Sequence, residues 1–161
     1  MVLDLEPVFN NIGMRLPFAF TFAMEDVPQA GPVTAEGAVE NRAGVVTFSA
    51  AVSFVRHTAC DRCLKALELP VRSEVSHVLV QQLADEADDA FVEVPTLRLD
   101  ADALLREDIL LLLPTKTLCR PDCKGLCPQC GADLNETDCG CKKPVDSRLA
   151  VLQQLLTEEP S

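Results

Sequence analysis

The sequence predicts an α+β protein in which an antiparallel β-sheet packs against one helix and is followed by a C-terminal cysteine-rich segment. Apolar and polar residues alternate in several stretches before residue 80, which is the period of a half-buried strand. A strong helical segment follows at 100–113, and six of the eight cysteines lie within 119–141. We therefore expect a core over residues 1–113 and a zinc-binding tail over residues 114–161, which ends in a short helix and docks on the core.

The first predicted strand covers residues 16–24, where alternate residues are large and apolar: Leu16, Phe18, Phe20, Phe22 and Met24. Pro17 marks it as an edge strand or a strand start, because proline cannot donate to a neighbouring strand. A weaker strand over 33–40 leads through a hairpin turn at 41–44 into a stronger strand over 45–55. These three segments form the N-terminal part of the sheet.

A second long strand over 67–79 follows the motif Cys60-Asp-Arg-Cys63. Because alternation continues on both sides of the motif, we expect this Cys-x-x-Cys at the tip of a β-hairpin. Residues 84–90 are an acidic, solvated loop and 91–94 a short strand.

The helix predicted over 100–113 has recognisable ends. Asp100 can accept hydrogen bonds from the free amides of the first turn, and Pro114 ends the helix. Its sheet-facing side chains are apolar: Leu104, Leu105, Ile109, Leu112 and Leu113. A last helix, capped by Asp146, places four leucines on one face: Leu149, Leu152, Leu155 and Leu156.

The eight cysteines indicate two four-cysteine metal sites, because a tetrahedral zinc ion binds four thiolates. A short connector over residues 131–138 lets one local site close, which we call the distal site: Cys127, Cys130, Cys139 and Cys141. The remaining four form a proximal site that ties the tail to the hairpin: Cys60, Cys63, Cys119 and Cys123. In an alternative pairing, one ion binds Cys119, Cys123, Cys127 and Cys130.

Disulfides are another interpretation of an even cysteine count. They are disfavoured because the N-terminal residues include acids where a signal peptide has positive charge, and reducing compartments keep thiols free. No stretch approaches the ~20 apolar residues of a membrane span. We expect a cytoplasmic protein without a membrane partner.

The charge distribution narrows the choice of partner. The net charge is −11, which disfavours a general nucleic-acid binder. Residues 114–148, however, contain six basic and five acidic residues, whereas the remainder contains eight basic and twenty acidic. This uneven charge distribution favours a basic protein as partner, or a structured RNA that is bound at one patch. The candidate contact residues are Lys116, Arg120, Lys124, Lys142, Lys143 and Arg148.

The chemistry predicted from these residues is noncatalytic. Four cysteines per ion leave no open coordination position for a substrate, and the sequence has no phosphate-binding glycine loop and no nucleophile elbow. Cys-x-x-Cys also occurs in thiol–disulfide exchange, but there it normally opens a helix after a strand. His57 is expected to be a polar residue near the hairpin end, and His77 a hydrogen-bonded core or sheet-edge residue.

The chain resembles the YceD family, the large ribosomal RNA subunit accumulation proteins of bacteria and plastids. The resemblance covers about three-quarters of the chain, from Gly37 to Leu156. It rests on Cys60-Asp-Arg-Cys63-Leu, the helix through Pro114, the string Cys119-x3-Cys-Lys-Gly-Leu-Cys-Pro-Gln-Cys-Gly-x-x-Leu-Asn135 and Asp146-Ser-Arg-Leu149. Ser147 stands where relatives often have proline, which should leave the helix start intact.

The resemblance implies a ribosome-biogenesis factor that supports accumulation or processing of large-subunit (23S) ribosomal RNA, with no established reaction. We therefore expect a noncatalytic protein with two structural zinc ions, no small-molecule substrate, and large-subunit RNA precursors or ribosomal proteins as partners. Two alternatives are a protein-binding module that docks a basic ribosomal protein, and a thiol redox or zinc-responsive switch.

Overall fold

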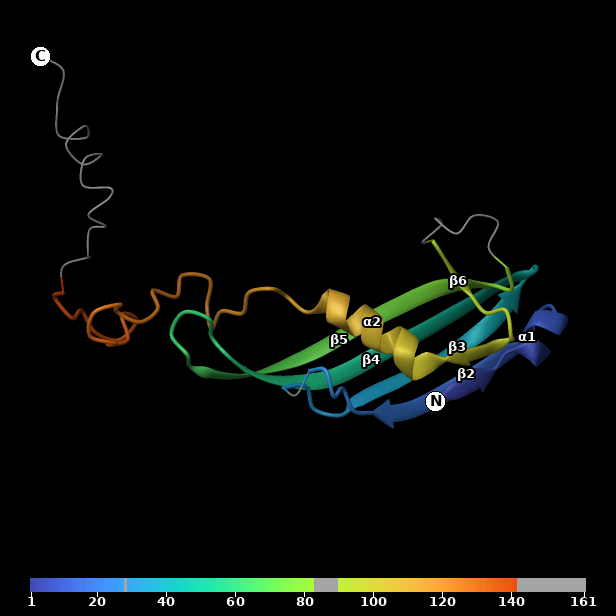
Figure 1. Cartoon of the computed structure of the whole chain (residues 1–161), viewed down its shortest axis with the longest axis horizontal. Coiled ribbons are helices and arrows are strands. Elements are labelled where there is room, and N and C mark those ends of the chain that lie inside the picture. Colours follow the sequence, from blue (N-terminus) through green and yellow to red (C-terminus); the bar gives the residue numbers. More distant parts are fainter. Residues whose placement is uncertain (28, 83–89, 142–161) are drawn as a thin grey trace, which may run out of the picture.

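The computed structural model describes residues 1–27, 29–82 and 90–141. A long, twisted sheet is covered on one face by a helix, and the cysteine-rich tail extends from one end (Figure 1). The elements in chain order are β1 (Val2–Asp4), α1 (Glu6–Asn10), β2 (Arg15–Phe22), β3 (Val33–Arg42), β4 (Val45–Ala59), β5 (Ala66–Val80), β6 (Phe91–Glu93), β7 (Arg98–Asp100) and α2 (Ala101–Leu112). The mixed α+β class, with a mostly antiparallel sheet and a packed helix, is thereby confirmed.

The main sheet has the strand order β2-β3-β4-β5-β6. β4 and β5 have 15 residues each, which corresponds to about 50 Å of extended chain. The β3–β4 ladder ends at Thr34↔Ser53, whereas the β4–β5 ladder continues to Ala59↔Ala66. The end of this hairpin therefore projects beyond β3 and carries Cys60 and Cys63 at its tip, as predicted.

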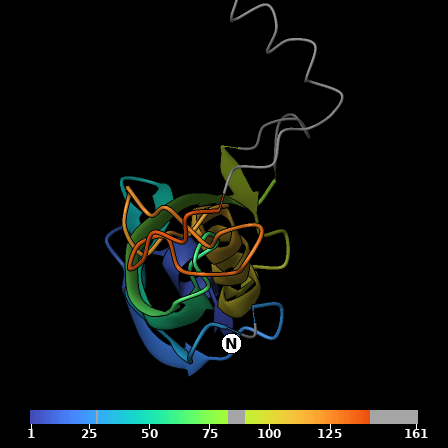
Figure 2. The same cartoon turned by 90° about the vertical axis from the view of Figure 1, so that its left-hand side faces the viewer.

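Helix α2 lies in the concave face of the sheet, which curls around it when seen end-on (Figure 2). Leu105 and Ile109 are buried and belong to the same apolar core as Phe48 of β4. The side chain of Asp100 accepts hydrogen bonds from Asp102 N and Ala103 N, so the predicted helix start and its cap are confirmed.

The exposed side of α2 differs from the prediction at one leucine. Leu112, expected on the sheet, is 46% exposed, and Leu111 is 87% exposed. A helix lying on a sheet buries only a stripe of its surface, and the stripe here contains Leu105 and Ile109. His77 of β5 contacts the same helix, since its Nε2 lies 2.8 Å from Oδ2 of Asp108. This confirms the hydrogen-bonded role expected of His77.

The short strands β1 and β7 were missed by the sequence prediction, and they pair antiparallel in a separate two-stranded ribbon. The short strand predicted at 91–94 is present as β6, but it pairs parallel with β5, so the sheet is not purely antiparallel. Three-residue strands are too short to show a period. Asn41 was also missed as an anchor: its buried Nδ2 donates to Val8 O at 2.8 Å and fastens α1 to the β3–β4 turn.

Some predictions fall on residues that are not described. The last helix expected from Asp146, and the acidic loop over 84–90 except Ala90, lie outside the described residues. The division into a core over 1–113 and a tail from 114 stays a prediction. No helix in the described part of the chain is long and apolar enough to cross a membrane.

Candidate metal centres

The proximal cluster is built on the tip of the β4–β5 hairpin. Cys60 N donates to Lys65 O at 2.9 Å and Leu64 N donates to Cys60 O at 2.9 Å, which folds the Cys-x-x-Cys into a tight turn. The tail brings two further cysteines to this turn. Cys60 Sγ lies 3.8 Å from Cys123 Sγ, and Cys63 Sγ lies 3.6 Å from Cys119 Sγ. All four sulfurs lie within 4.8 Å of one another.

These distances fit a tetrahedral ion. Zinc–sulfur bonds of about 2.3 Å in a tetrahedron place the sulfurs about 3.8 Å apart. Cys60, Cys63 and Cys123 are buried and Cys119 is partly exposed. The proximal cluster therefore suits a closed, structural site with four soft ligands.

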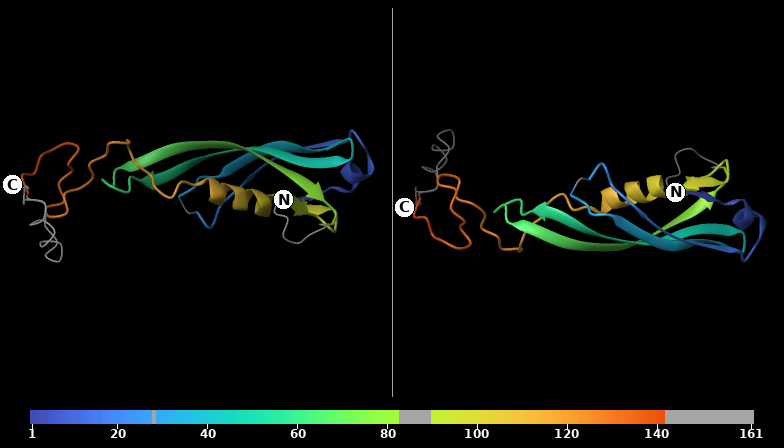
Figure 3. Two further views of the ribbon diagram at one scale, coloured as in Figure 1. Left: turned by 90° about the horizontal axis from the view of Figure 1, so that it is seen from above. Right: turned by 90° about the horizontal axis from the view of Figure 1, so that it is seen from below.

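Hydrogen bonds that do not involve sulfur also dock the tail on the hairpin tip. Asp61 N donates to Thr117 O at 2.9 Å, and Thr117 N donates to the Asp61 carboxylate. Arg62 Nη1 donates to Cys123 O at 2.6 Å. Thr117 is buried, with 6% of its surface exposed. Both views in Figure 3 show the tail running on past the hairpin tip, at the end of the sheet opposite α1.

The distal cluster lies wholly within the tail. Gly131 N donates to Cys127 O at 2.9 Å, and Cys127 N donates to Ala132 O at 2.8 Å. This turn and the later cysteines bring four sulfurs within 4.8 Å: Cys127, Cys130, Cys139 and Cys141. Cys127 is buried, whereas Cys130 and Cys141 are exposed. The distal cluster is thus a local site nearer to solvent.

Asn135 connects the two clusters. It lies in the connector of the distal site, yet its Nδ2 donates to Sγ of Cys123 at 3.4 Å. Its Oδ1 accepts from Lys124 N at 2.7 Å and from Arg120 Nη2 at 2.9 Å. Sequence reasoning missed this role, although the Leu-Asn end of the cysteine string contains the residue. A side-chain amide that donates to a thiolate is a typical outer partner of a metal ligand.

The thiols of the proximal cluster differ in pKa. Burial alone raises the pKa of Cys60, but backbone amide hydrogen bonds, from Cys63 and Cys119 among others, lower it to about 6. Burial and the neighbouring Cys63 and Cys123 thiols raise the pKa of Cys119 to about 12. Four crowded thiols cannot all ionise without a cation among them.

The distal cluster shows the same split. Backbone hydrogen bonds from Cys130 and Gln129 lower the pKa of Cys127 to about 6. The neighbouring Cys130 and Cys139 thiols raise the pKa of Cys141 to about 12. Each cluster therefore stabilises a first thiolate, and a cation bound among the four sulfurs would stabilise the remaining ones.

The eight cysteines form the proximal and distal clusters that their spacing favoured. They do not form the alternative pairing. All eight thiols are free, which contradicts the disulfide interpretation. His57 belongs to neither cluster, and its exposed Nδ1 lies 3.5 Å from Glu68.

The predicted contact residues divide into three groups. Lys116 and Lys124 are exposed and form no ion pair within the described residues. Arg120 is held by Asn135 and lies 3.5 Å from Asp122. Lys142, Lys143 and Arg148 lie outside the described residues. Arg62 and Lys65, which the prediction did not include, lie at the hairpin tip, and Arg62 contacts the tail through Cys123 O.

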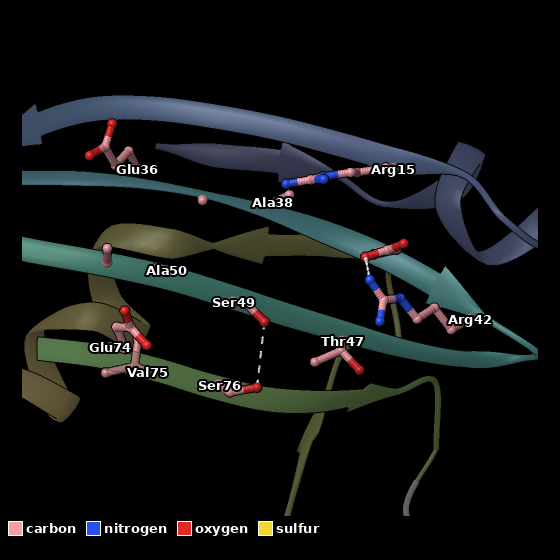
Figure 4. Close-up of a pocket in the computed structure, with 13 residues that line it drawn as sticks. Arg15, Glu36, Ala38, Arg42, Thr47, Ser49, Ala50, Glu74, Val75 and Ser76 are labelled. Atoms are coloured by element: carbon pink, nitrogen blue, oxygen red, sulfur yellow. Dashed lines mark hydrogen bonds and ion pairs between the residues drawn. The ribbon is translucent and has the colours of Figure 1, made fainter.

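A groove of about 650 Å³ lies on the outer face of the sheet, opposite α2 (Figure 4). Its floor is made of small residues such as Ser49 and Ser76, and its rim includes the Glu40–Arg42 ion pair at 3.0 Å. No cysteine or histidine lines it. The groove therefore has no connection with either cysteine cluster.

The fold and these clusters define an α+β protein with two four-cysteine sites, each of which could hold a metal ion. The chain belongs to the YceD family, since the family described as "Large ribosomal RNA subunit accumulation protein YceD" matches residues 48–156. This confirms the resemblance stated from the motifs.

Related proteins are found in two bacterial groups. Uncharacterised proteins of Mycobacterium tuberculosis and Mycobacterium bovis are 35% identical over 108 residues, which cover 62% of this chain and 50% of theirs. The uncharacterised protein YlbN of Bacillus subtilis is 28% identical over 139 residues, or 83% of this chain and 80% of its own. The chain thus matches about half the length of the mycobacterial relatives. No solved structure matches it significantly.

Proposed function

We propose that this protein is a noncatalytic ribosome-biogenesis factor that supports accumulation or processing of large-subunit (23S) ribosomal RNA. The observation that carries the proposal is the match of residues 48–156 to a family named for accumulation of this RNA. All eight cysteines of the two clusters lie within that matched region.

Each cluster would hold one structural zinc ion. Four sulfur ligands complete the tetrahedral shell of zinc, which suits a structural rather than a catalytic role. Structural zinc contributes on the order of 10 kcal/mol of apparent binding free energy in small domains. At the proximal cluster this energy would fasten the tail to the hairpin tip, because Cys119 and Cys123 come from the tail and the other two ligands from the hairpin.

A noncatalytic role agrees with the composition of the sites. Both clusters consist of thiols alone, with no carboxylate or imidazole among the ligands that could act as a general base. Large-subunit RNA precursors or ribosomal proteins would then be bound rather than converted.

A second candidate function is favoured by the charge of the sheet body. In residues 1–27, 29–55, 66–82 and 90–113, the body contains five basic and thirteen acidic residues. A surface of this sign complements a basic ribosomal protein. In this alternative the body would bind such a protein and would not contact RNA directly.

Crosslinking in cells tests the proposal, followed by sequencing of bound RNA and identification of bound protein. Depletion of the protein is expected to lower mature large-subunit ribosomal RNA relative to small-subunit RNA, and crosslinks are expected in large-subunit precursors. Protein partners that survive nuclease treatment without any RNA crosslink would support the protein-docking alternative. Unchanged RNA ratios and no ribosomal partner of either kind would contradict both.

A further inference from the structure

We propose that the hairpin tip and the docked tail form one continuous RNA-contact surface. We call it the knuckle surface, and it consists of Arg62, Leu64, Lys65, Lys116 and Lys124. The inference rests on the proposed function and extends it, because it assigns the contact to particular residues of both segments. Two independent observations support it: the distribution of charge, and the conformation of Leu64.

Basic residues are concentrated in the hairpin tip and in the first part of the tail, whereas the distal connector that follows contains Asp133, Glu136 and Asp138 and no basic residue. Of the eleven lysines and arginines in the described part of the chain, six lie in residues 56–65 and 114–124, where only two acidic residues occur. These two segments are far apart in sequence and meet through the Asp61–Thr117 backbone hydrogen bond at 2.9 Å and the Arg62 Nη1–Cys123 O hydrogen bond at 2.6 Å. Docking of the tail thereby joins two weak basic segments into one positive region on an otherwise acidic protein.

The lysines of the knuckle surface are available for a ligand. Lys65, Lys116 and Lys124 are exposed, and none of them forms an ion pair or a side-chain hydrogen bond with another described residue. Arg62 is exposed as well, although one of its nitrogens donates to Cys123 O. Ammonium groups on flexible stems suit phosphates whose spacing varies, as in a folded RNA.

Leu64 occupies a backbone conformation that favours glycine. Its φ is +60°, and it directly follows the second cysteine of its Cys-x-x-Cys. The equivalent position in the distal turn is Gly131, whose φ is +74°. The Leu64 side chain is also 67% exposed. Neither the turn nor the core therefore requires a leucine here, although both the left-handed backbone and the exposed apolar surface cost free energy.

These two costs are explained if Leu64 packs against the ligand. An apolar side chain between cationic neighbours can cover the face of an unstacked base or a ribose while the flanking Arg62 and Lys65 bind phosphates. The chain has no tryptophan or tyrosine for such a contact. A basic ribosomal protein would be repelled by the positive charge, so this surface and the acidic body serve different partners.

Binding of the full zinc-loaded chain to a full-length transcript of large-subunit ribosomal RNA at ~0.1 M salt tests the proposal. The double substitution Lys65→Glu/Lys124→Glu is expected to weaken binding by about tenfold or more and to reduce the salt dependence by about two phosphate contacts. The matched control Arg72→Glu/Arg98→Glu makes the same charge change on exposed residues of the body, and it should bind like the unmodified protein.

Leu64→Gly separates binding from folding. Glycine relieves the positive φ, so the thermal stability should be unchanged or higher, whereas RNA affinity should fall by about tenfold through loss of the apolar contact. Ile12→Gly is the control, since Ile12 is 76% exposed and closely follows α1, which lies at the end of the sheet opposite the hairpin tip (Figure 1). It should leave RNA binding unchanged.

The outcomes distinguish an error in the knuckle surface from an error in the proposed function. If the unmodified protein binds the transcript and both knuckle variants bind equally well, the knuckle surface is wrong and the proposed function stands. If the unmodified protein does not bind the transcript, or retains only an acidic protein from ribosomal fractions, the RNA-contact proposal is overturned together with direct RNA binding in the proposed function.

Discussion

The carbonyl oxygen of Arg62 lies 3.0 Å from the position that a Cβ atom on Gly125 would occupy. Gly125 also has a φ of +79°, in the left-handed region. The same carbonyl accepts the Leu126 amide at 3.1 Å. The tail thus runs so close to the hairpin backbone that any larger residue at this position of the Cys-Lys-Gly-Leu-Cys segment would meet both a strained φ and the Arg62 carbonyl.

Gly125→Ala is therefore expected to destabilise the zinc-loaded protein by about 2–3 kcal/mol, through backbone strain and contact with a carbonyl that cannot move freely. Chemical denaturation measures the change. Gly131→Ala is the matched control, because its φ is +74° but nothing lies within 4 Å of the added Cβ. It should cost only about 1 kcal/mol, and equal losses for the two variants would contradict the close approach.

Loss of the proximal ion and loss of the distal ion should affect the tail differently. The unmodified chain is expected to bind about two zinc ions, one in each four-thiol cluster. Cys63→Ser should remove the proximal ion and make the segment after Pro114 sensitive to proteases, since that segment contributes Cys119 and Cys123. Cys141→Ser should remove the distal ion and leave the early tail protected. Metal analysis and limited proteolysis check this, and two ions retained in either variant would contradict the ligand sets.

Asn135 lies in the distal connector, and its side chain should increase the metal affinity of the proximal site. Asn135→Ala removes the hydrogen bond to Sγ of Cys123, and loss of an outer partner typically costs ten- to a hundredfold in metal affinity. Competition with a chelator of known affinity measures it. Thr137→Ala is the control, because Thr137 belongs to the same connector but its hydroxyl donates to Asp133 O rather than to sulfur.

Zinc affinity should rise with pH. In the metal-free protein the pKa of Cys119 and that of Cys141 are raised to about 12, so both thiols are protonated at neutral pH. Zinc must displace these protons, and binding therefore releases them. Below pH 6, Cys60 and Cys127 also protonate, because their pKa values are about 6. Proton release in calorimetry with buffers of different ionisation enthalpy checks this, and affinity independent of pH would contradict it.

The core under α2 should be sensitive to truncation. Ile109→Ala removes a side chain that is 1% exposed, and such a change typically costs 2–5 kcal/mol. Leu111→Ala, in the same helix but 87% exposed, should stay within about 0.5 kcal/mol. Thermal unfolding of both variants compares them, and similar losses would mean that α2 is oriented differently.

Local patterns made much of this structure predictable. The alternation before and after Cys60-Asp-Arg-Cys63 indicated two long strands, and the ladder from Val46↔Leu79 to Ala59↔Ala66 is that hairpin. Asp100 and Pro114 bracket a helix that runs over Ala101–Leu112. Cysteine spacing favoured the grouping that the sulfurs adopt. Each of these features depends on residues that are near neighbours in the chain or have one dominant chemistry.

Other features depend on contacts between distant segments and left no local signal. The Asn41 side chain holds α1, more than thirty residues earlier. β6 joins β5 in parallel, and β1 pairs with β7 from the other end of the core. The three-residue strands β1 and β7 and a single buried amide have no period for a sequence pattern to show, and the short strand predicted at 91–94 carried no sign of its parallel pairing.

The amino-acid sequence by itself determined the strand and helix periods, the hairpin that carries the first cysteine pair, and a thiol set sufficient for two ions. Only the tertiary structure decided that Gly125 lies against Arg62, that Asn135 reaches the other cluster, and that the Arg62 side chain binds the tail at Cys123 O. The reason is physical: hydrophobic period and ligand spacing act along the chain, whereas close backbone approach and summed surface charge exist only after distant segments have packed together.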